Sequence, residues 1–353
     1  MVVGSNPTGP TISYYDVSWI SERWAGNSYH PPMPISPSGK MGEYVWDLNA
    51  MPRIEGRTAI VTGASSGLGA QITRLLASKG ASVVLVDIDV VKATMLADGL
   101  RSIYPDLDFE VFGIDLGDLL MVRRFVDSFR SKHDSLDLLV NNAGIMVRSY
   151  ARTQQGFESQ WGINHLGHFS LTAQLLDLLV QNQGSRVVTQ TSIVHRGGSI
   201  DFDDINSERS FRPWGAYKQS KLATLLSSRE LQRRLELANI KSLISVACHP
   251  GLVDTALYSQ RKKMRVGLRP FMHSIEKGAL PALRACLDPG VKGGEVYGPD
   301  GWMQFKGRPV KVQPLNKGKD MALAKKVWEL SERMTGVDFT ACLDKASVKM
   351  SVK

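Results

Sequence analysis

The chain has 353 residues, of which 43% are hydrophobic and 22% are charged, a balance typical of globular proteins that excludes wholesale disorder and fibrous repeats. Lys and Arg (43) outnumber Asp and Glu (34), so the net charge is +9. The excess lies in residues 256–353, which carry +10, whereas residues 1–55 carry −2 and residues 56–255 carry +1. Because the main body is almost neutral, we expect no nucleic-acid partner.

The cysteines are few, odd in number and far apart, at Cys248, Cys286 and Cys342. This pattern argues against a disulfide framework and against a zinc site, and it fits a reducing compartment. No apolar run reaches the ~18 residues that a membrane span needs. The first residues resemble neither a signal peptide nor an Arg-rich transit peptide. We therefore expect a cytoplasmic protein without a membrane span.

Residues 1–55 are rich in Pro, Gly and aromatic residues, and no helical or alternating pattern in them lasts longer than a turn. We interpret them as an irregular N-terminal arm. Their aromatic side chains are too many for a solvated tail, so we expect the arm to pack on the main body or on a second subunit. These aromatic residues are Tyr14, Tyr15, Trp19, Trp24, Tyr29, Tyr44 and Trp46.

From residue 57 onwards, short apolar runs alternate with amphipathic stretches. The runs predict strands at 58–62, 81–87, 109–116, 136–140, 185–191 and 241–248. The stretches predict helices that end near 79 and near 132, and further helices at 90–101, 155–181 and 214–237. Such alternation indicates a parallel sheet covered on both faces. We predict an α/β protein with a single doubly wound Rossmann domain at 56–310.

The segment 311–353 is predicted to be a basic C-terminal helical tail, with an amphipathic helix at 321–334 and a frayed end. A basic run at 261–265 follows the sixth strand, and we interpret it as a solvated loop edge, with contact to an acidic substrate or a membrane surface as the alternative. Apolar residues around it, at 257–272, suggest a lid over a hydrophobic substrate.

A glycine-rich loop, T-G-A-S-S-G-L-G at 62–69, follows the first strand and opens the first helix. Gly63 can make the tight turn, Gly67 allows close backbone approach to a pyrophosphate, and Gly69 allows the helix to pack on the strand. The anion would lie at the positive end of the helix. The spacing differs from G-x-G-x-x-G, so an ordinary turn is the alternative.

Asp87 closes the second predicted strand. A carboxylate there can accept both ribose hydroxyls of an adenosine, and it repels a 2′-phosphate. Ile88 and Asp89 follow it, so no Arg is present to pair with such a phosphate. The pattern favours NAD, with NADP as the alternative; Asp87 could instead simply cap the next helix.

Tyr217 and Lys221 are four residues apart in a predicted helix and therefore lie on one face of it. A nearby cation lowers the pKa of a phenol from its usual ~10, which allows proton exchange near neutral pH. An exposed Tyr and Lys on a helix surface are the alternative. Ser192 ends the fifth strand, where a hydroxyl can hold a carbonyl oxygen, and N-N-A-G at 141–144 ends the fourth.

Taken together and in this order, the motifs resemble the short-chain dehydrogenase/reductase family over residues 56–300. The matching pieces are T-G-A-S-S-G-L-G at 62–69, Asp115-Leu116, N-N-A-G at 141–144, Asn164, Ser192, Y-K-Q-S-K at 217–221 and Pro250-Gly251. Within the family, N-H-L-G-H-F at 164–169 and H-P-G-L-V-D-T at 249–255 resemble the branch of retinol dehydrogenases, WW-domain oxidoreductases and protochlorophyllide reductases.

The resemblance implies that Tyr217 is the general acid/base, Lys221 assists it and binds the nicotinamide ribose, Ser192 orients the substrate oxygen and Asn164 holds a relay water. A hydride would move between the nicotinamide and a carbinol carbon. The implied cofactor contacts are Gly63, Ser65, Ser66, Gly67, Leu68, Gly69, Asp87, Asp115, Leu116, Asn142, Ala143, Gly144, Tyr217, Lys221, Pro250, Gly251, Val253 and Thr255.

The sequence departs from the family pattern at two places. Thr191 stands where the family usually has a Ser, and Asp87-Ile88 replaces the Arg found in the NADP-using branch. The second departure puts both NADP use and the branch's substrates in doubt.

The predicted function is therefore oxidoreduction of an alcohol or ketone, with a C=C reductase and a non-catalytic dinucleotide sensor as alternatives. Family members usually pair through the helices expected at 155–181 and 214–237, so we expect a homodimer or homotetramer. A metal site at His165, His168, His195 and His249 is not expected, because no carboxylate or cysteine lies at ligand spacing.

Overall fold

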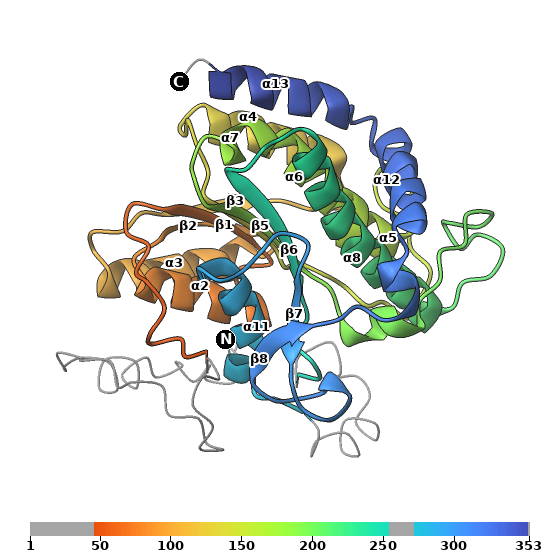
Figure 1. The fold of residues 1–353 in the computed structure, drawn as a ribbon, viewed down its shortest axis with the longest axis horizontal. Coiled ribbons are helices and arrows are strands. Elements are labelled where there is room, and N and C mark those ends of the chain that lie inside the picture. Colours follow the sequence, from red (N-terminus) through yellow and green to blue (C-terminus); the bar gives the residue numbers. More distant parts are fainter. Residues whose placement is uncertain (1–45, 254–271, 352–353) are drawn as a thin grey trace, which may run out of the picture. The chain divides into compact units, whose positions relative to one another are not determined.

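The structure is a computed structural model that describes residues 46–253 and 272–351 (Figure 1). All of these residues belong to one compact unit, which begins at Trp46. Several predictions concern residues outside the described ranges. These are the aromatic residues of the arm except Trp46, the cofactor contact at Thr255, the basic run at 261–265 and most of the expected lid.

The described residues form an eight-stranded sheet with the order β3-β2-β1-β4-β5-β6-β7-β8. Its strands are β1 (Thr58–Thr62), β2 (Ser82–Asp87), β3 (Phe109–Gly113), β4 (Leu138–Asn141), β5 (Ser185–Gln190), β6 (Leu243–Cys248), β7 (Val296–Pro299) and β8 (Pro309–Val312). All neighbouring pairs are parallel except β7 with β8. The strand order reverses between β1 and β4, which confirms the doubly wound Rossmann fold.

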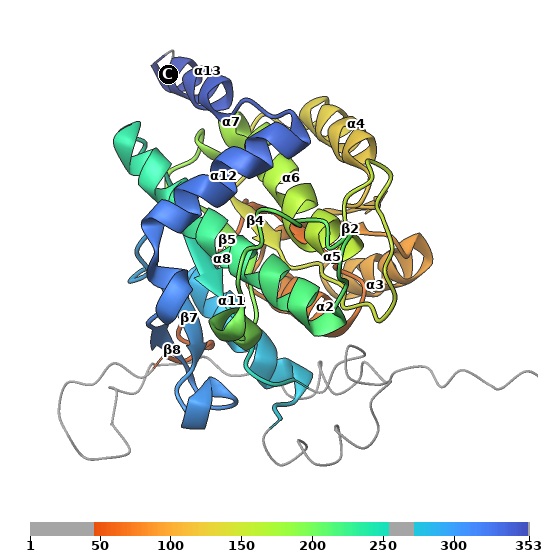
Figure 2. The same ribbon diagram turned by 90° about the vertical axis from the view of Figure 1, so that its right-hand side faces the viewer.

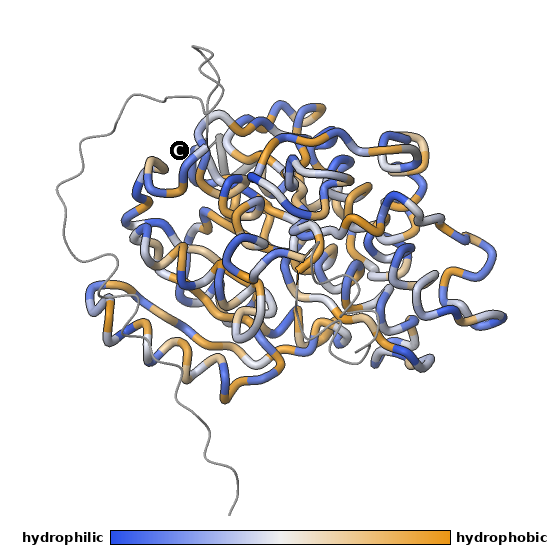
Figure 3. Tube along the Cα trace, turned by 90° about the horizontal axis from the view of Figure 1, so that it is seen from below, coloured by the Kyte–Doolittle hydropathy of each residue, from blue (hydrophilic) through white to orange (hydrophobic). Residues whose placement is uncertain are grey.

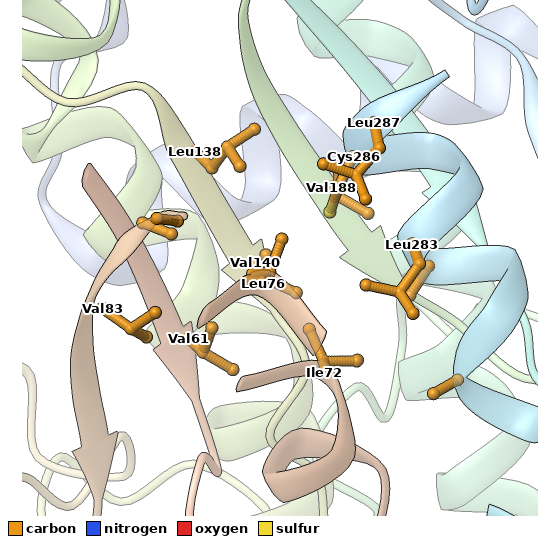
Figure 4. Close-up of a cluster of buried hydrophobic side chains, with 14 of the residues drawn as sticks. Val61, Ile72, Leu76, Val83, Leu138, Val140, Val188, Leu283, Cys286 and Leu287 are labelled. Atoms are coloured by element: carbon orange, nitrogen blue, oxygen red, sulfur yellow. The ribbon is translucent and has the colours of Figure 1, made fainter. Parts of the chain in front are cut away.

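Helices cover both faces of the sheet (Figure 1). One layer holds α2 (Gly67–Ser78), α3 (Val90–Ile103) and α11 (Ile275–Leu287); the other holds α4 (Leu119–Arg130), α6 (His168–Gln174), α7 (Leu176–Leu179) and α8 (Pro213–Leu237). Successive strand residues point to opposite faces, so Val61 packs in the first core cluster and Ile60 in the second. Figure 4 shows the first cluster, in which Ile72 and Leu76 of α2 and Leu283 of α11 gather with Val61, Val140 and Val188 of the sheet.

The helix expected at 155–181 is the main departure from the prediction. It begins only at α5 (Ser159–Trp161), because the Glu158 carboxylate accepts the N–H groups of Gln160 and Trp161 and caps it there. A π-helical turn, η1 (Gly162–Gly167), follows, and then α6 and α7. A side chain on Gly167 would collide with the Leu116 carbonyl, so glycine permits the close approach of η1 to that loop.

The C-terminal region is more ordered than predicted. The expected helix is present as α12 (Met321–Thr335), but the expected frayed end is wrong, because α13 (Phe339–Ser351) is a helix. Trp328 of α12 lies edge-on to Phe169 of α6 and to Phe339 of α13, with ring centroids 4.8 and 4.6 Å apart. α12 packs along α8 and α13 along α7 (Figure 2). The apolar side chains buried there give the tail its order.

The segment before β1 also packs on the body. Trp46 and Met51 are buried in the first core cluster, and the Trp46 indole N–H donates to the Met51 sulfur at 3.0 Å. Helix α11 and strands β7 and β8 were not expected from the sequence. Within the described residues, no helix is long and apolar enough to cross a membrane, and hydrophilic positions interrupt the hydrophobic ones along the helices (Figure 3).

We expect Trp328→Ala to lower the free energy of unfolding by about 3–5 kcal/mol, because it empties the space between α6, α8 and α13. Leu237→Ala is the control: Leu237 ends α8 with 73% of its surface exposed, and its change should stay within about 0.5 kcal/mol. Urea unfolding measures both. Equal losses in the two variants would contradict the packing described here.

Candidate active site

The residues singled out from the sequence gather at the carboxyl edge of the sheet. Thr62 ends β1, Asp87 ends β2 and Asn141 ends β4, while Ser192 and His249 follow β5 and β6. Because these strands are parallel, their carboxyl ends meet at one edge, where α/β sheets bind ligands. The fold thus brings together residues that lie more than a hundred positions apart.

The glycine-rich loop has the geometry of an anion cradle. Gly63 and Gly67 have φ angles of 63° and 52°, a left-handed conformation that glycine adopts at little cost. A Cβ on Gly69 would collide with the Gly63 carbonyl, so only glycine lets α2 pack this close to β1. Ser66, the N-cap of α2, makes no side-chain capping bond. The first-turn N–H groups therefore gain no acceptor from Ser66, and they fit a pyrophosphate.

Asp87 is tied to this loop. Its carboxylate accepts the backbone N–H of Ser65 at 2.8 Å and that of Asp89 at 3.0 Å, and the residue is buried. The helix that follows is capped by Asp89, whose side chain accepts the Lys92 N–H at 3.1 Å. Helix capping therefore does not account for Asp87, and its position beside the loop fits an adenosine ribose.

The segment at 141–144 joins the loop to the catalytic side of the edge. The N–H groups of Asn142 and Ala143 donate to the Thr62 hydroxyl at 2.9 and 3.0 Å, and the Asn142 amide donates to the Thr62 carbonyl at 2.8 Å. A Cβ built on Gly144 would lie 3.1 Å from Lys221 Nζ and 3.3 Å from Asn164 Oδ1. Gly144, Asn164 and Lys221 therefore form one cluster.

Lys221 lies buried on α8, and its ammonium donates to the Gln190 carbonyl at the end of β5, at 3.1 Å. Burial lowers the pKa of Lys221 to about 8, because the charged form loses its hydration. The Thr191 hydroxyl donates to the Lys221 carbonyl at 2.6 Å and so fastens α8 to the strand end that carries Ser192. This bond shows that Thr191 has a structural role beside Ser192.

Tyr217 lies one turn before Lys221 on α8 and is 5% exposed. Its ring packs edge-on to Trp214, with centroids 6.1 Å apart. Ser192 is 8% exposed and is the N-cap of the short 3₁₀ helix η2 (Ile193–Gly197). Because Tyr217 and Lys221 are both buried, they are not the exposed Tyr and Lys of an ordinary helix surface.

Asn164 lies in the π-helical turn, and its amide is fully engaged. Nδ2 donates to the Ile145 carbonyl at 2.9 Å and to the Ser220 hydroxyl at 3.0 Å, while Oδ1 accepts the Ile145 N–H at 2.7 Å. The side chain therefore holds the loop after β4 against α8, next to Lys221. π-Turns of this kind occur frequently at functional sites.

The other predicted contacts lie around the same edge. The Asp115 carboxylate accepts the Gly117 N–H at 2.7 Å, and Leu116 is buried. Gly251, after Pro250, has φ 75°, and a Cβ there would collide with the Phe305 carbonyl. Val253 is buried, and a Cβ built on Gly278 would contact both Val253 and Leu68.

Sequence reasoning missed the loop between β7 and β8. His249 donates from Nε2 to the Gln304 side-chain carbonyl at 2.9 Å, and Arg196 donates to the Met303 carbonyl at 3.2 Å. Met303 and Gln304 have φ angles of 49° and 59°, which non-glycine residues rarely adopt. The loop thus borders the segments that follow Ser192 and β6. Glycines on both sides of the short apolar runs at 294–312 are the signal that could have predicted this hairpin.

Within the described residues, no cluster of three or more His, Cys, Asp or Glu side chains could hold a metal. Burial lowers the pKa of five histidines among the described residues far below 6.5: His165 and His249 to about 3, and His168, His195 and His273 to about 4. They are therefore neutral at physiological pH.

A family model described as short chain dehydrogenase matches residues 57–266. The chain belongs to this family. Mouse retinol dehydrogenase 14 is 34% identical over 302 residues, which cover 80% of this chain and 87% of the relative. Mouse polyprenol dehydrogenase is 35% identical, with 81% and 86% covered. A crystal structure of a putative uncharacterized protein from Mycobacterium paratuberculosis is 38% identical, covers 84% of this chain and 99% of its own, and has a TM-score of 0.71.

The resemblance to the retinol dehydrogenase branch is thereby confirmed. This short-chain dehydrogenase is an NAD(P)-dependent oxidoreductase of alcohol and carbonyl groups. The alternative function, reduction of a C=C bond, is not favoured, because these relatives are named as dehydrogenases of alcohols.

Gly69→Ala should weaken dinucleotide binding more than tenfold, because the added Cβ drives α2 away from the Gly63 carbonyl. Gly99→Ala is the matched control: Gly99 lies inside α3 with nothing within 4 Å of its Cβ position, so it should bind normally and gain up to about 1 kcal/mol of stability. Calorimetric titration measures the affinity. Unchanged binding by Gly69→Ala would contradict the cradle.

Acid should destabilise the protein below pH ~6.5. Between the lowered pKa of each buried histidine and ~6.5, the unfolded chain binds protons that the folded chain does not, so stability falls as pH falls. Each histidine contributes a slope of up to about 1.4 kcal/mol per pH unit. Urea unfolding at pH 7, 6 and 5 measures it, and His165→Gln should flatten the slope. A pH-independent midpoint would show that these histidines are not buried as described.

Proposed function

We propose that this dehydrogenase uses NAD to interconvert a hydrophobic alcohol and its carbonyl compound, with Tyr217 as the general acid/base. The observation that carries the proposal is that the segment at 141–144 connects the two halves of the site. Lys221 Nζ and Asn164 Oδ1 both face the place that a Cβ on Gly144 would take, and the Asn142 N–H donates to the end of β1 beside the glycine loop. A dinucleotide held by the loop would thus reach the buried Tyr217–Lys221 pair.

In this mechanism the Ser192 hydroxyl binds the substrate oxygen and orients it toward Tyr217. The Tyr217 hydroxyl donates a proton to that oxygen during reduction and accepts it during oxidation. The Lys221 ammonium, buried where water does not screen it, stabilises the tyrosinate. Asn164 binds the loop after β4 and the hydroxyl of Ser220, next to Lys221. The relay water expected at Asn164 stays a prediction.

The cofactor would be held by the loop at 63–69, Asp87, Asp115-Leu116, 142–144 and 250–253, with Thr255 predicted as a further contact. When bound, the nicotinamide supplies or accepts the hydride. Asp87 supports NAD, since its buried carboxylate would repel a 2′-phosphate.

The curated relatives that match the chain are named for retinol and polyprenol, both apolar alcohols. They support a hydrophobic alcohol as the substrate class of this chain. A cytoplasmic location stays a prediction. So does a homodimer or homotetramer, which would have to use faces of α7 and α8 that α12 and α13 leave uncovered.

Tyr217→Phe should reduce kcat by at least 100-fold with NAD affinity unchanged, because it removes the proton donor and keeps the ring. The control is Tyr104→Phe, at the end of α3, which should keep full activity. NADH absorbance with a panel of apolar alcohols measures both. Full activity of Tyr217→Phe would contradict the proposal.

Asp87→Asn keeps an acceptor for the Ser65 N–H but removes the charge, so we expect kcat/KM for NADP to rise about tenfold and that for NAD to fall. Asp89→Asn, two residues away, should leave the ratio unchanged. Steady-state kinetics with both dinucleotides measure it. A wild-type preference for NADP would contradict the assignment of Asp87.

A further inference from the structure

His168 is a buried histidine that the mechanism above does not use. It is the first residue of α6, directly after the π-helical turn, and is 4% exposed. Its Nδ1 lies 3.1 Å from the Asn164 carbonyl, and its Nε2 lies 2.8 Å from the Thr62 hydroxyl. One ring therefore contacts both the end of the strand that precedes the glycine loop and the turn that carries Asn164.

The partners of the ring determine its proton. A carbonyl oxygen can only accept, so Nδ1 carries the proton and donates to Asn164. Burial lowers the pKa of His168 to about 4, and the positive charge of Lys221 acts in the same direction, so the ring is neutral. Nε2 is then a bare acceptor, and the Thr62 hydroxyl must donate to it.

This direction completes the bonding of Thr62. Both lone pairs of its hydroxyl accept N–H groups, from Asn142 and Ala143, and its proton goes to His168 at 2.8 Å rather than to the Val140 carbonyl at 3.3 Å. A protonated ring would direct an N–H at an oxygen that has no lone pair left. Only the neutral ring with its proton on Nδ1 satisfies the Thr62 hydroxyl, the two N–H groups that it accepts and the Asn164 carbonyl.

The other end of the bridge fixes the backbone of Asn164. The Thr224 hydroxyl, 3.4 Å from the same carbonyl, donates instead to the Ser220 carbonyl at 2.7 Å. His168 is therefore the principal side-chain donor to the Asn164 carbonyl within the described residues. The peptide of Asn164 sets the direction of the amide that holds Ile145 and Ser220 beside Lys221.

We propose that His168 is a positioning residue that couples the glycine loop to the Asn164–Lys221 cluster, with Nε2 supporting dinucleotide binding and Nδ1 supporting catalysis. The proposal rests on the roles proposed above for Asn164 and Lys221. Its two bonds can be removed one at a time, because an asparagine amide nitrogen reaches the position of Nδ1 and a glutamine carbonyl reaches that of Nε2.

His168→Asn keeps a donor for Asn164 and loses the Thr62 bond, so the dissociation constant for NAD should rise about tenfold with kcat within about twofold. His168→Gln keeps an acceptor for Thr62 and loses the Asn164 bond, so kcat should fall about tenfold and its pH profile should shift, with NAD affinity retained. Calorimetric titration of NAD, which needs no turnover, and pH-dependent kinetics measure the two effects separately.

The control is His165→Asn. His165 is equally buried, three residues earlier, and its Nε2 lies 2.7 Å from the Ser331 hydroxyl of α12. The His165→Asn variant should lower the melting temperature and leave NAD affinity and kcat unchanged. It therefore distinguishes a loss of positioning from a general loss of stability.

The Thr62 side of the bridge gives an independent test if the His168 variants do not fold. Thr62→Val should weaken NAD binding, Thr62→Ser should not, and Thr62→Val combined with His168→Asn should cost less than the sum of the single changes. Additive effects of the Thr62 and His168 changes on NAD affinity would overturn the proposed bridge. It would also be overturned if His168→Asn and His168→Gln changed NAD affinity and kcat to the same extent, or changed neither. Full activity of Tyr217→Phe would instead refute the proposed function. The two failures are distinguishable, because the NAD affinity of His168→Asn is measured without turnover.

Discussion

The hydroxyl of Thr62 stands where the strand order of the sheet reverses, and the edge of the site depends on the bonds it makes. It accepts two backbone N–H groups from the end of β4 and lies 2.8 Å from a ring nitrogen of His168. The gap between β1 and β4 is where an α/β sheet opens to a ligand. Closing this gap with side-chain bonds gives the glycine loop a fixed base, and the first-turn N–H groups of α2, which gain no acceptor from the Ser66 side chain, fit an anion there.

Burial then sets the chemistry of the edge. Lys221 has lost most of its hydration, which lowers its pKa to about 8, and its charge acts on its neighbours through an apolar interior. The five buried histidines of the described residues stay neutral under the same conditions, so they serve as directional hydrogen-bonding groups. Lys221 is thus a buried cation at this edge, and these histidines do not compete with it for protons.

The sequence predicted the first six strands, and most helices to within a few residues, because apolar runs and amphipathic periods are local signals. It did not predict the break of the helix expected at 155–181. The Glu158 cap is a local bond that the periodic pattern does not show, and the close approach of Gly167 to Leu116 depends on a segment about fifty residues earlier in the chain. The order of α13 depends on Trp328 and Phe339, whose burial requires the rest of the fold. β7 and β8 are only four residues each, too short for a periodic signal.

The residues of the candidate site could be singled out from the sequence, because each comes from a recognisable motif, and their roles stay predictions. What the sequence did not show is how they connect: that Asp89 and not Asp87 caps α3, that Asn142 binds the end of β1, and that His168 touches both halves. Those contacts join residues from different strands, and no spacing along one segment encodes them.

The most direct test of the account uses NADH carrying deuterium at both C4 positions and a long-chain α,β-unsaturated ketone. Carbonyl reduction predicts an allylic alcohol with deuterium on its carbinol carbon, detected by mass spectrometry and NMR. A saturated ketone labelled at the β-carbon would contradict the account.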